Sequence, residues 1–527
     1  MAIQWKLWGA TLVLSILYYG PYGYQYDILN TPQAVIEDFM VSALQQKYHV
    51  QLSSTVISLI WAFNVALLSI GNVIGCGLAS LVADKLGRKR GLLLVVNPIG
   101  IAADILMIIS KPCNSAELLF IGRLVAGIRL GLASSISATY LIESSPEDMR
   151  GTVGSILDFW LVVMGNTFAF LLGMPFLLGR PETWSYLLGL DIVCAVLAVA
   201  VGPLFPGSPR FQLIIKEDRK AARQAISFFH GKHVSTHNVI RQIMREDSFA
   251  TEQASEMSTS ELLKTYRSTL LLSIAVGLLP ATSGYQALGS YSTPMLRLAG
   301  MHGQWAETYT LIMAGFEMIG SIASLWANHH APRRHVLLYS AGLTVLGNII
   351  LFLLLQLKTW PSLATPQVSA YLVDGAGCVM FLIAGLNALA LYPLTTIIPA
   401  ELAPLPVRAL ATSVGLGALA VGDVTTKLAV WPIYNLIGQY IFLILALITA
   451  VCLIPLIRWL PETNAFFQSD PFPMPPIPED LEHSLKSRSL IFNGATKRTN
   501  YNSITTDTDN AHLSSTPIPV LYRDTAQ

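Results

Sequence analysis

Long apolar runs separated by short polar segments dominate the chain. A helix needs roughly 20 predominantly apolar residues to span a membrane. Twelve runs reach that length, and they form two groups of six on either side of a polar segment with helical spacing at about 207–267. We therefore predict spans at about 7–28, 54–83, 91–110, 117–142, 151–178, 184–205, 268–293, 305–327, 336–357, 369–400, 409–432 and 438–458.

The order of these runs predicts an all-α integral membrane protein. An N-terminal six-helix bundle is predicted over 7–206 and a C-terminal six-helix bundle over 268–460. The polar segment over 207–267 is predicted to be a cytoplasmic helical linker. Beyond Pro461 the chain is rich in Pro, Ser and Thr and contains no further apolar run, so 461–527 is predicted to be a disordered cytoplasmic tail.

The composition excludes an ordinary soluble enzyme. Hydrophobic residues make up 53% of the 527 residues and charged residues only 12%, whereas soluble proteins carry roughly 25% charged residues. The net charge of +1 gives no basic excess for nucleic acid, so the expected partners are the lipid bilayer and a small solute. Five scattered cysteines without a CxxC pair indicate neither a metal site nor a disulfide framework, and no cofactor is expected.

The distribution of Lys and Arg predicts the orientation. Loops on one side contain Lys85 to Arg90, Arg150, Arg333 and Arg408, whereas loops on the other side contain only isolated cations. Positive residues favour the cytoplasmic side. Both termini are therefore expected in the cytoplasm, and we expect the plasma membrane as the location.

Two polar motifs occur once in each half of the chain. Glu143-Ser-Ser-Pro-x-x-x-Arg150 has the spacing of Glu401-Leu-Ala-Pro-x-x-x-Arg408, and Gly87-Arg88-Lys89 corresponds to Pro332-Arg333-Arg334. Both pairs are separated by about 250 residues, as are Pro206 and Pro461. Parallel repeats of six helices are typical of major-facilitator transporters.

The repeated charges lie at the predicted cytoplasmic ends of spans. Their carboxylates and guanidiniums can pair across helices, and a gate needs contacts that exist in only one of two states. A simpler interpretation is that the cations only set the topology. We predict a gate formed by Arg88, Glu143, Arg150, Arg333, Glu401 and Arg408.

These motifs together resemble the sugar-porter branch of the major facilitators, the family of facilitative hexose carriers. The resemblance covers about residues 8–465 and is based on Asp84 to Arg90, Gly122-Arg123, Glu143 to Gly151, Pro206-Gly-Ser-Pro-Arg210 and Pro461-Glu462-Thr463. It implies twelve helices and an alternating-access mechanism. No covalent chemistry is implied, so the protein is not expected to be an enzyme.

Several positions depart from the family pattern in ways that bear on the substrate. The seventh-helix stretch around Ser283 and Gln286 has lost two amides, and Pro393-Leu394-Thr395-Thr396 in the tenth helix lacks the family's tryptophan. Gly207 replaces a glutamate of the family motif. Gln25 stands where proton-coupled relatives carry an aspartate, which argues against the family's usual proton coupling.

Counting from the motifs places three carboxylates at positions where the family has amides in the cavity. These are Asp158, Glu317 and Asp423. A charge in the middle of a membrane costs about 2.5–3.5 kcal/mol on insertion scales, so each should face water, a partner or a substrate. Arg129 is a candidate partner for Asp158 and Lys427 for Asp423. Each carboxylate can either pair with this cation or face the cavity, and the sequence leaves both alternatives open. The predicted substrate-binding residues are Gln25, Asp158, Ser283, Gln286, Glu317, Thr396 and Asp423.

Other features are predicted to be structural. Asp27, Asp104, Asp191 and Asp374 lie near predicted span ends and are expected at the membrane interface. The glycine-rich stretches Gly71 to Gly77 and Gly415 to Gly422 are expected to let helices approach closely.

The sequence leaves three functions to weigh. The first is facilitative uniport of a small polar solute, most plausibly a hexose such as glucose or fructose. The second is a proton-coupled or cationic-solute carrier of the same fold, which three cavity carboxylates would favour. The third is a solute sensor that does not transport, which the depleted sugar site favours slightly.

Overall fold

The computed structural model describes residues 5–463, apart from 147–148, 160–164, 232–233, 257–263, 302–303, 361–364 and 404. Within these residues the regular elements are helices, and there are no strands. Ten helices in this part of the chain are long and apolar enough to cross a membrane. They coincide with ten of the predicted runs, and the all-α fold is confirmed.

Four of the ten lie in the N-terminal half. They are α4 (Ser54–Leu86), the run Arg88–Ser110 that contains α5 (Arg88–Gly91) and α6 (Asn97–Ser110), α7 (Ala116–Ser144), and the run Trp184–Leu204 that contains α10 (Trp184–Leu188) and α11 (Ile192–Val201).

The first predicted span is divided into shorter helices, and the fifth contains two helices on either side of residues outside the description. The first consists of α1 (Trp5–Leu14), a π-helical turn (Ser15–Tyr19) and α2 (Gly20–Asp27). The fifth contains α8 (Arg150–Phe159) and α9 (Thr167–Leu172). A separate helix, α3 (Gln33–Tyr48), follows the first span.

The C-terminal half supplies the other six long helices. They are the run of α15 (Arg267–Thr282) and α16 (Tyr285–Leu298), then α17 (Trp305–His330), α18 (Arg333–Lys358), the run of α19 (Pro366–Leu386) and α20 (Tyr392–Leu402), α21 (Leu405–Ile437) and α22 (Tyr440–Trp459).

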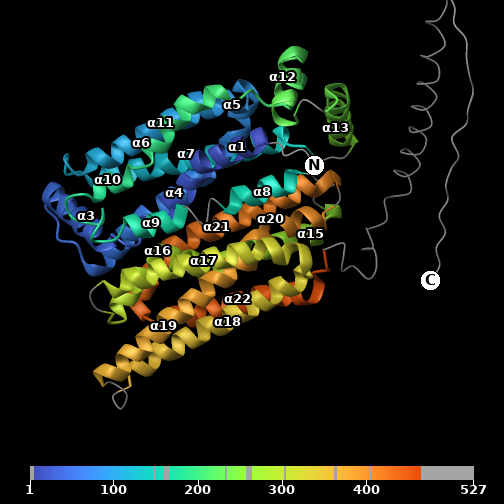
Figure 1. Ribbon diagram of the computed structural model, residues 1–527. Coiled ribbons are helices and arrows are strands. Elements are labelled where there is room, and N and C mark those ends of the chain that lie inside the picture. Colours follow the sequence, from blue (N-terminus) through green and yellow to red (C-terminus); the bar gives the residue numbers. More distant parts are fainter. Residues whose placement is uncertain are drawn as a thin grey trace, which may run out of the picture. The chain divides into compact units, whose positions relative to one another are not determined.

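Two α-helices lie in the described part of the segment between the halves. Asp218 caps α12 (Arg219–Phe229) by accepting a hydrogen bond of 2.9 Å from the Ala221 amide. Phe229 at the end of α12 is fully buried and packs edge-on against Tyr140 of α7. The second helix is α13 (Thr236–Glu256). Figure 1 shows α12 and α13 at the opposite end of the N-terminal helices from α3. We call these ends the linker side and the α3 side.

Glycines bring pairs of helices into backbone contact, as predicted. A Cβ added at Gly71 of α4 would collide with the carbonyl oxygen of Leu124 in α7. In the C-terminal half, a Cβ at Gly320 of α17 would collide with the carbonyl oxygen of Gly385 in α19. The two contacts join corresponding helices of the two halves, so the repeat seen in the polar motifs also governs the packing.

The seventh span is broken where its sequence departs from the family pattern. Gly284 separates α15 from α16 and has φ +87°, a left-handed conformation that side chains with a Cβ rarely adopt. The break lies between Ser283 and Gln286, so the two residues do not belong to one continuous helix. The two residues therefore face different surroundings although they are three positions apart.

Candidate functional site: a cavity between the two halves

A cavity of about 490 Å³ lies between the N-terminal and C-terminal helices. Its wall is largely apolar, with a limited set of hydroxyl, amide and carboxyl groups, which is typical of small-molecule sites. On α7 the lining continues from Ser134 to Ile142, toward the linker side. The polar lining side chains are Tyr19, Tyr22, Tyr26, Asp27, Asn72, Ser134, Ser135, Asn166, Tyr285, Gln286, Tyr392, Thr395, Thr396 and Asp423.

Two tyrosine rings and an amide form part of the wall in the N-terminal half. Tyr22 and Tyr26 lie one turn apart on α2, and their rings stack at 4.8 Å. The amide nitrogen of Asn72 on α4 donates hydrogen bonds of 3.0 Å to both hydroxyls. This arrangement offers a flat apolar surface edged with neutral hydrogen-bonding groups.

Asp423 lines the cavity and is also paired. Its carboxylate lies 3.1 Å from the Nζ atom of Lys427, one turn later on α21. Lys427 is 1% exposed, donates to Ser69 of α4 at 3.0 Å, and lies 3.9 Å from the ring centre of Tyr26. Asp423 therefore faces the cavity and also pairs with Lys427, which were the two alternatives left open by the sequence. Its negative charge is balanced by a lysine that also joins the two halves.

Glu317 connects the halves at a second point. This carboxylate on α17 is 1% exposed and accepts a 3.2 Å hydrogen bond from Asn166, which itself lines the cavity. Its other oxygen, Oε1, has no hydrogen-bond partner within the described residues. Glu317 is therefore separated from the cavity by one amide.

Gln286 and Thr396 line the cavity, whereas Gln25 and Ser283 do not. The Gln25 amide donates to the Leu188 carbonyl at 3.0 Å, and Gln25 accepts hydrogen bonds from Arg123. Ser283 donates to the side chain of Asn387 at 2.8 Å. Both side chains hold helices together and lie outside the lining of this cavity, and their role in substrate binding stays a prediction. The side chain of Asp158 lies outside the described residues.

Arg129 pairs with a carboxylate that the sequence analysis assigned to the interface. Its guanidinium lies 2.5 Å from Asp191, and both side chains are buried. Arg129 thus has Asp191 as a partner, and the pairing with Asp158 suggested by the sequence lies outside the described side chains. Asp104 is also buried, at 2% exposure, and Asp27 lines the cavity. All three aspartates are covered by neighbouring helices, and their predicted level at the membrane interface stays a prediction. Asp374 is half-buried.

Asn30 joins the two halves on the α3 side. The Asn30 amide, just after α2, donates to the carbonyl oxygen of Gly289 at 2.6 Å and to the Ser292 hydroxyl at 2.9 Å. Its oxygen accepts a 3.0 Å hydrogen bond from the Thr293 backbone amide. Nearby, Asn435 of α21 donates to Ser58 of α4 at 3.1 Å. These contacts tie the first and second spans to the seventh and eleventh.

On the linker side, the repeated charges form equivalent pairs in each half. Arg88 lies 2.8 Å from Glu143, and Arg333 pairs with Glu401. Each of these pairs joins helices of its own half. Arg150 reaches Glu246 of α13 at 3.5 Å, and the side chain of Arg408 lies outside the described residues.

Several polar contacts were not anticipated from the sequence. Asn30 lies beyond the predicted first span, and Asn166 and Asn72 are ordinary polar residues within apolar runs. An intramembrane asparagine is a signal in itself, because its amide requires hydrogen-bond partners in an apolar environment. Its partner, however, cannot be identified from the sequence.

Comparison with known proteins shows which family has this architecture. Residues 12–467 match the family model described as "Sugar (and other) transporter". The chain is 30% identical over 340 residues to solute carrier family 2, facilitated glucose transporter member 3 of Ovis aries, covering 64% of this chain and 67% of that protein. For the Mus musculus protein of the same name, the identity is 32% over 342 residues, covering 64% and 68%.

The fold is similar to that of a solved bacterial transporter. A partially occluded inward-open structure of the xylose transporter XylE from E. coli superimposes with a TM-score of 0.69 at 16% identity, covering 87% of this chain and 98% of that one. An inward-open structure of the same transporter gives a TM-score of 0.68. The predictions of a major-facilitator fold and of a protein that is not an enzyme are confirmed. With its repeated helices, central cavity and family match, the chain belongs to the sugar transporter family of the major facilitator superfamily.

Proposed function

We propose that this protein carries a hexose, such as glucose or fructose, across the membrane by facilitative uniport. The charge balance at the cavity wall supports a neutral substrate, because Asp423 is already paired with Lys427. Apart from the Asp27 carboxyl, the remaining polar lining offers amides, hydroxyls and stacked tyrosine rings, which suit the hydroxyls and the apolar face of a sugar. The curated relatives are named as glucose transporters.

The proposed mechanism is alternating access around this cavity. In this proposal the bundles at 7–206 and 268–460 rock against each other, and the linker at 207–267 stays on the cytoplasmic side. The Asn30 contacts with α16 close the α3 side. The pairs Arg88–Glu143 and Arg333–Glu401 hold the helix ends that gate the linker side. We place the protein in the plasma membrane, with both termini and the 461–527 tail in the cytoplasm.

Uptake of labelled glucose and fructose into proteoliposomes tests the proposal. We expect saturable uptake that an imposed pH gradient does not change. The Gln286→Ala variant should raise KM about threefold to tenfold, because it removes one neutral hydrogen bond worth about 0.5–1.5 kcal/mol. Gln304→Ala is the matched control, since Gln304 is exposed at the start of α17 and outside the cavity. Absence of hexose uptake by folded protein would overturn the proposal.

A second candidate function is proton-coupled transport. Asp27 lines the cavity without an ion pair among the described residues, and Glu317 Oε1 has no hydrogen-bond partner there. Either carboxyl group can bind a proton, and protonation would change its hydrogen-bond partner. Uptake driven by an inward proton gradient, and lost in both Asp27→Asn and Glu317→Gln, would favour this function over uniport.

A further inference from the structure

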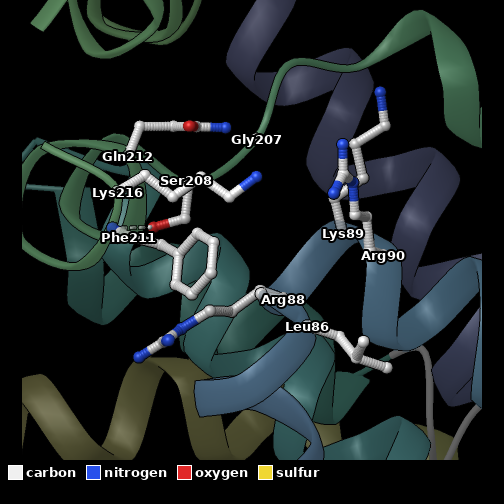
Figure 2. Close-up of a pocket in the computed structure, with 10 residues that line it drawn as sticks. Leu86, Arg88, Lys89, Arg90, Gly207, Ser208, Phe211, Gln212 and Lys216 are labelled. Carbon is white, nitrogen blue, oxygen red and sulfur yellow. Dashed lines mark hydrogen bonds between the residues drawn. The ribbon is translucent and has the colours of Figure 1, made fainter. Parts of the chain in front are cut away.

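A second pocket, of about 200 Å³, lies on the linker side of the N-terminal half. It is formed by the turn between α4 and α5 and by the segment that follows the sixth span (Figure 2). None of its lining residues carries a carboxylate. Four of them are cations, namely Arg88, Lys89, Arg90 and Lys216. In Figure 2, Lys216 extends from one wall, and Lys89 and Arg90 lie on the other.

Among the residues that the structure describes, only one of these four charges is balanced by a carboxylate. Arg88 is paired with Glu143 at 2.8 Å and with Asp84 at 3.4 Å. Lys89 donates to two backbone carbonyls, those of Pro203 and Phe205. Carbonyl oxygens satisfy its protons but supply no negative charge. Arg90 and Lys216 are exposed and have no ion pair within the residues that the structure describes.

The C-terminal half shows what occupies the corresponding place there. Glu462 accepts hydrogen bonds of 2.9 and 3.1 Å from the backbone amides of Arg333 and Arg334, the first residues of α18. In the N-terminal half, the residue corresponding to Glu462 is Gly207, and the helix corresponding to α18 begins at Arg88.

Gly207 lines the cationic pocket and has no side chain. The helix that begins at Arg88 has no side-chain hydrogen bond at its cap, Gly87. The N-terminal half therefore keeps the cations but lacks the carboxylate that its repeat possesses. An anion from outside the chain would complete the site.

We propose that this pocket binds the phosphate group of a ligand, either an anionic lipid headgroup or a free phosphate compound. A phosphate has several acceptor oxygens and up to two charges, which match the two lysines and the arginine that line the pocket from two walls. The pocket lies at the ends of membrane helices, at the level where lipid headgroups meet basic residues. A free phosphate would reach it from solution.

Thermal unfolding of the full-length protein in nanodiscs tests this site without any transport. The first probe is inorganic phosphate added to nanodiscs of phosphatidylcholine alone. The second is a nanodisc series in which phosphatidylinositol 4-phosphate replaces part of the phosphatidylcholine. We expect at least one probe to raise the apparent Tm of the wild-type protein. A response to phosphate alone identifies a soluble ligand, and a response to the lipid alone identifies a headgroup.

Two variants connect the response to the pocket. Arg90→Ala combined with Lys216→Ala should weaken binding about 25-fold, because each cation contributes about a fivefold change in affinity. Gly207→Glu supplies the missing carboxylate and should abolish the response. Gly207→Ala is its matched control, since both place a Cβ near the flexible end of Gln212 but only one adds a charge.

The apparent Tm of each variant in phosphatidylcholine alone shows that it is folded. The proposal is overturned if neither probe shifts the Tm of the wild-type protein. It is equally overturned if the shift persists in Gly207→Glu and in the double variant. Because the measurement needs no substrate, it fails or succeeds independently of hexose transport.

Discussion

Replacing Arg129 by Met should destabilise the N-terminal half more than any single change to its partners. The guanidinium lies 2.5 Å from Asp191, with side-chain exposures of 1% and 3%. Asp104, itself buried, interacts electrostatically with both groups. Arg129 is therefore the cation that balances two buried carboxylates, Asp104 and Asp191. Its removal leaves the two carboxylates next to each other without a compensating positive charge.

The expected cost follows from this count of charges. Removing one partner of a buried ion pair costs about 3–5 kcal/mol, because a charge is left buried without compensation. Asp191→Asn should cost less, since Asp104 still balances Arg129. The double variant Arg129→Met with Asp191→Leu should recover much of the loss, because well-packed apolar groups often replace a buried pair without penalty.

Unfolding by SDS titration in mixed micelles measures these differences, with the ten tryptophans as the fluorescent probe. Lys47→Met is the control, since it breaks an ion pair with Glu117 in which both side chains are largely solvated, and it should change little. The reasoning is refuted if Arg129→Met lies within about 1 kcal/mol of the wild-type protein. It is also refuted if the double variant is less stable than Arg129→Met.

Three further outcomes follow from the packing and the cavity. Asn30→Ala should shift the protein toward opening on the α3 side, because it removes the hydrogen bonds to α16; spin-label distances across that side measure the shift. Gly71→Leu should prevent folding because its side chain would meet the α7 backbone, whereas Gly77→Leu on the same helix should be tolerated because nothing lies within 4 Å; the yield of monodisperse protein distinguishes them. Cys76 lines the cavity, so a maleimide should inhibit uptake, and Cys76→Ser should protect against it; equal inhibition of both proteins would show that another cysteine is responsible.

The positions of the helices could be predicted from the sequence, because membrane spans depend on the length of apolar runs. The run predicted at 336–357, for example, is a helix from Arg333 to Lys358. The repeat was also visible, since Glu143 and Glu401 occupy the same place in each half and form equivalent pairs.

The directions of individual side chains could not be predicted. Ser283 and Gln286 were both expected on the cavity wall, but the left-handed Gly284 turns one away from the other. The partner of Arg129 lies 62 residues away on another helix, a separation that no count along one helix reveals. Asp27 and Asp191 lie near span ends, and only the arrangement of neighbouring helices shows that they are covered.

The closure at Asn30 has a consequence for how this carrier can change over evolution. Most of its hydrogen bonds to α16 involve the main chain, namely the Leu288 and Gly289 carbonyls and the Thr293 amide. Main-chain groups persist through almost any substitution. The same helix presents Gln286 to the cavity. Substitutions on α16 can therefore change the substrate selectivity while the hydrogen bonds from Asn30 remain. Conservation of these contacts depends chiefly on Asn30 itself, in the loop after the first span.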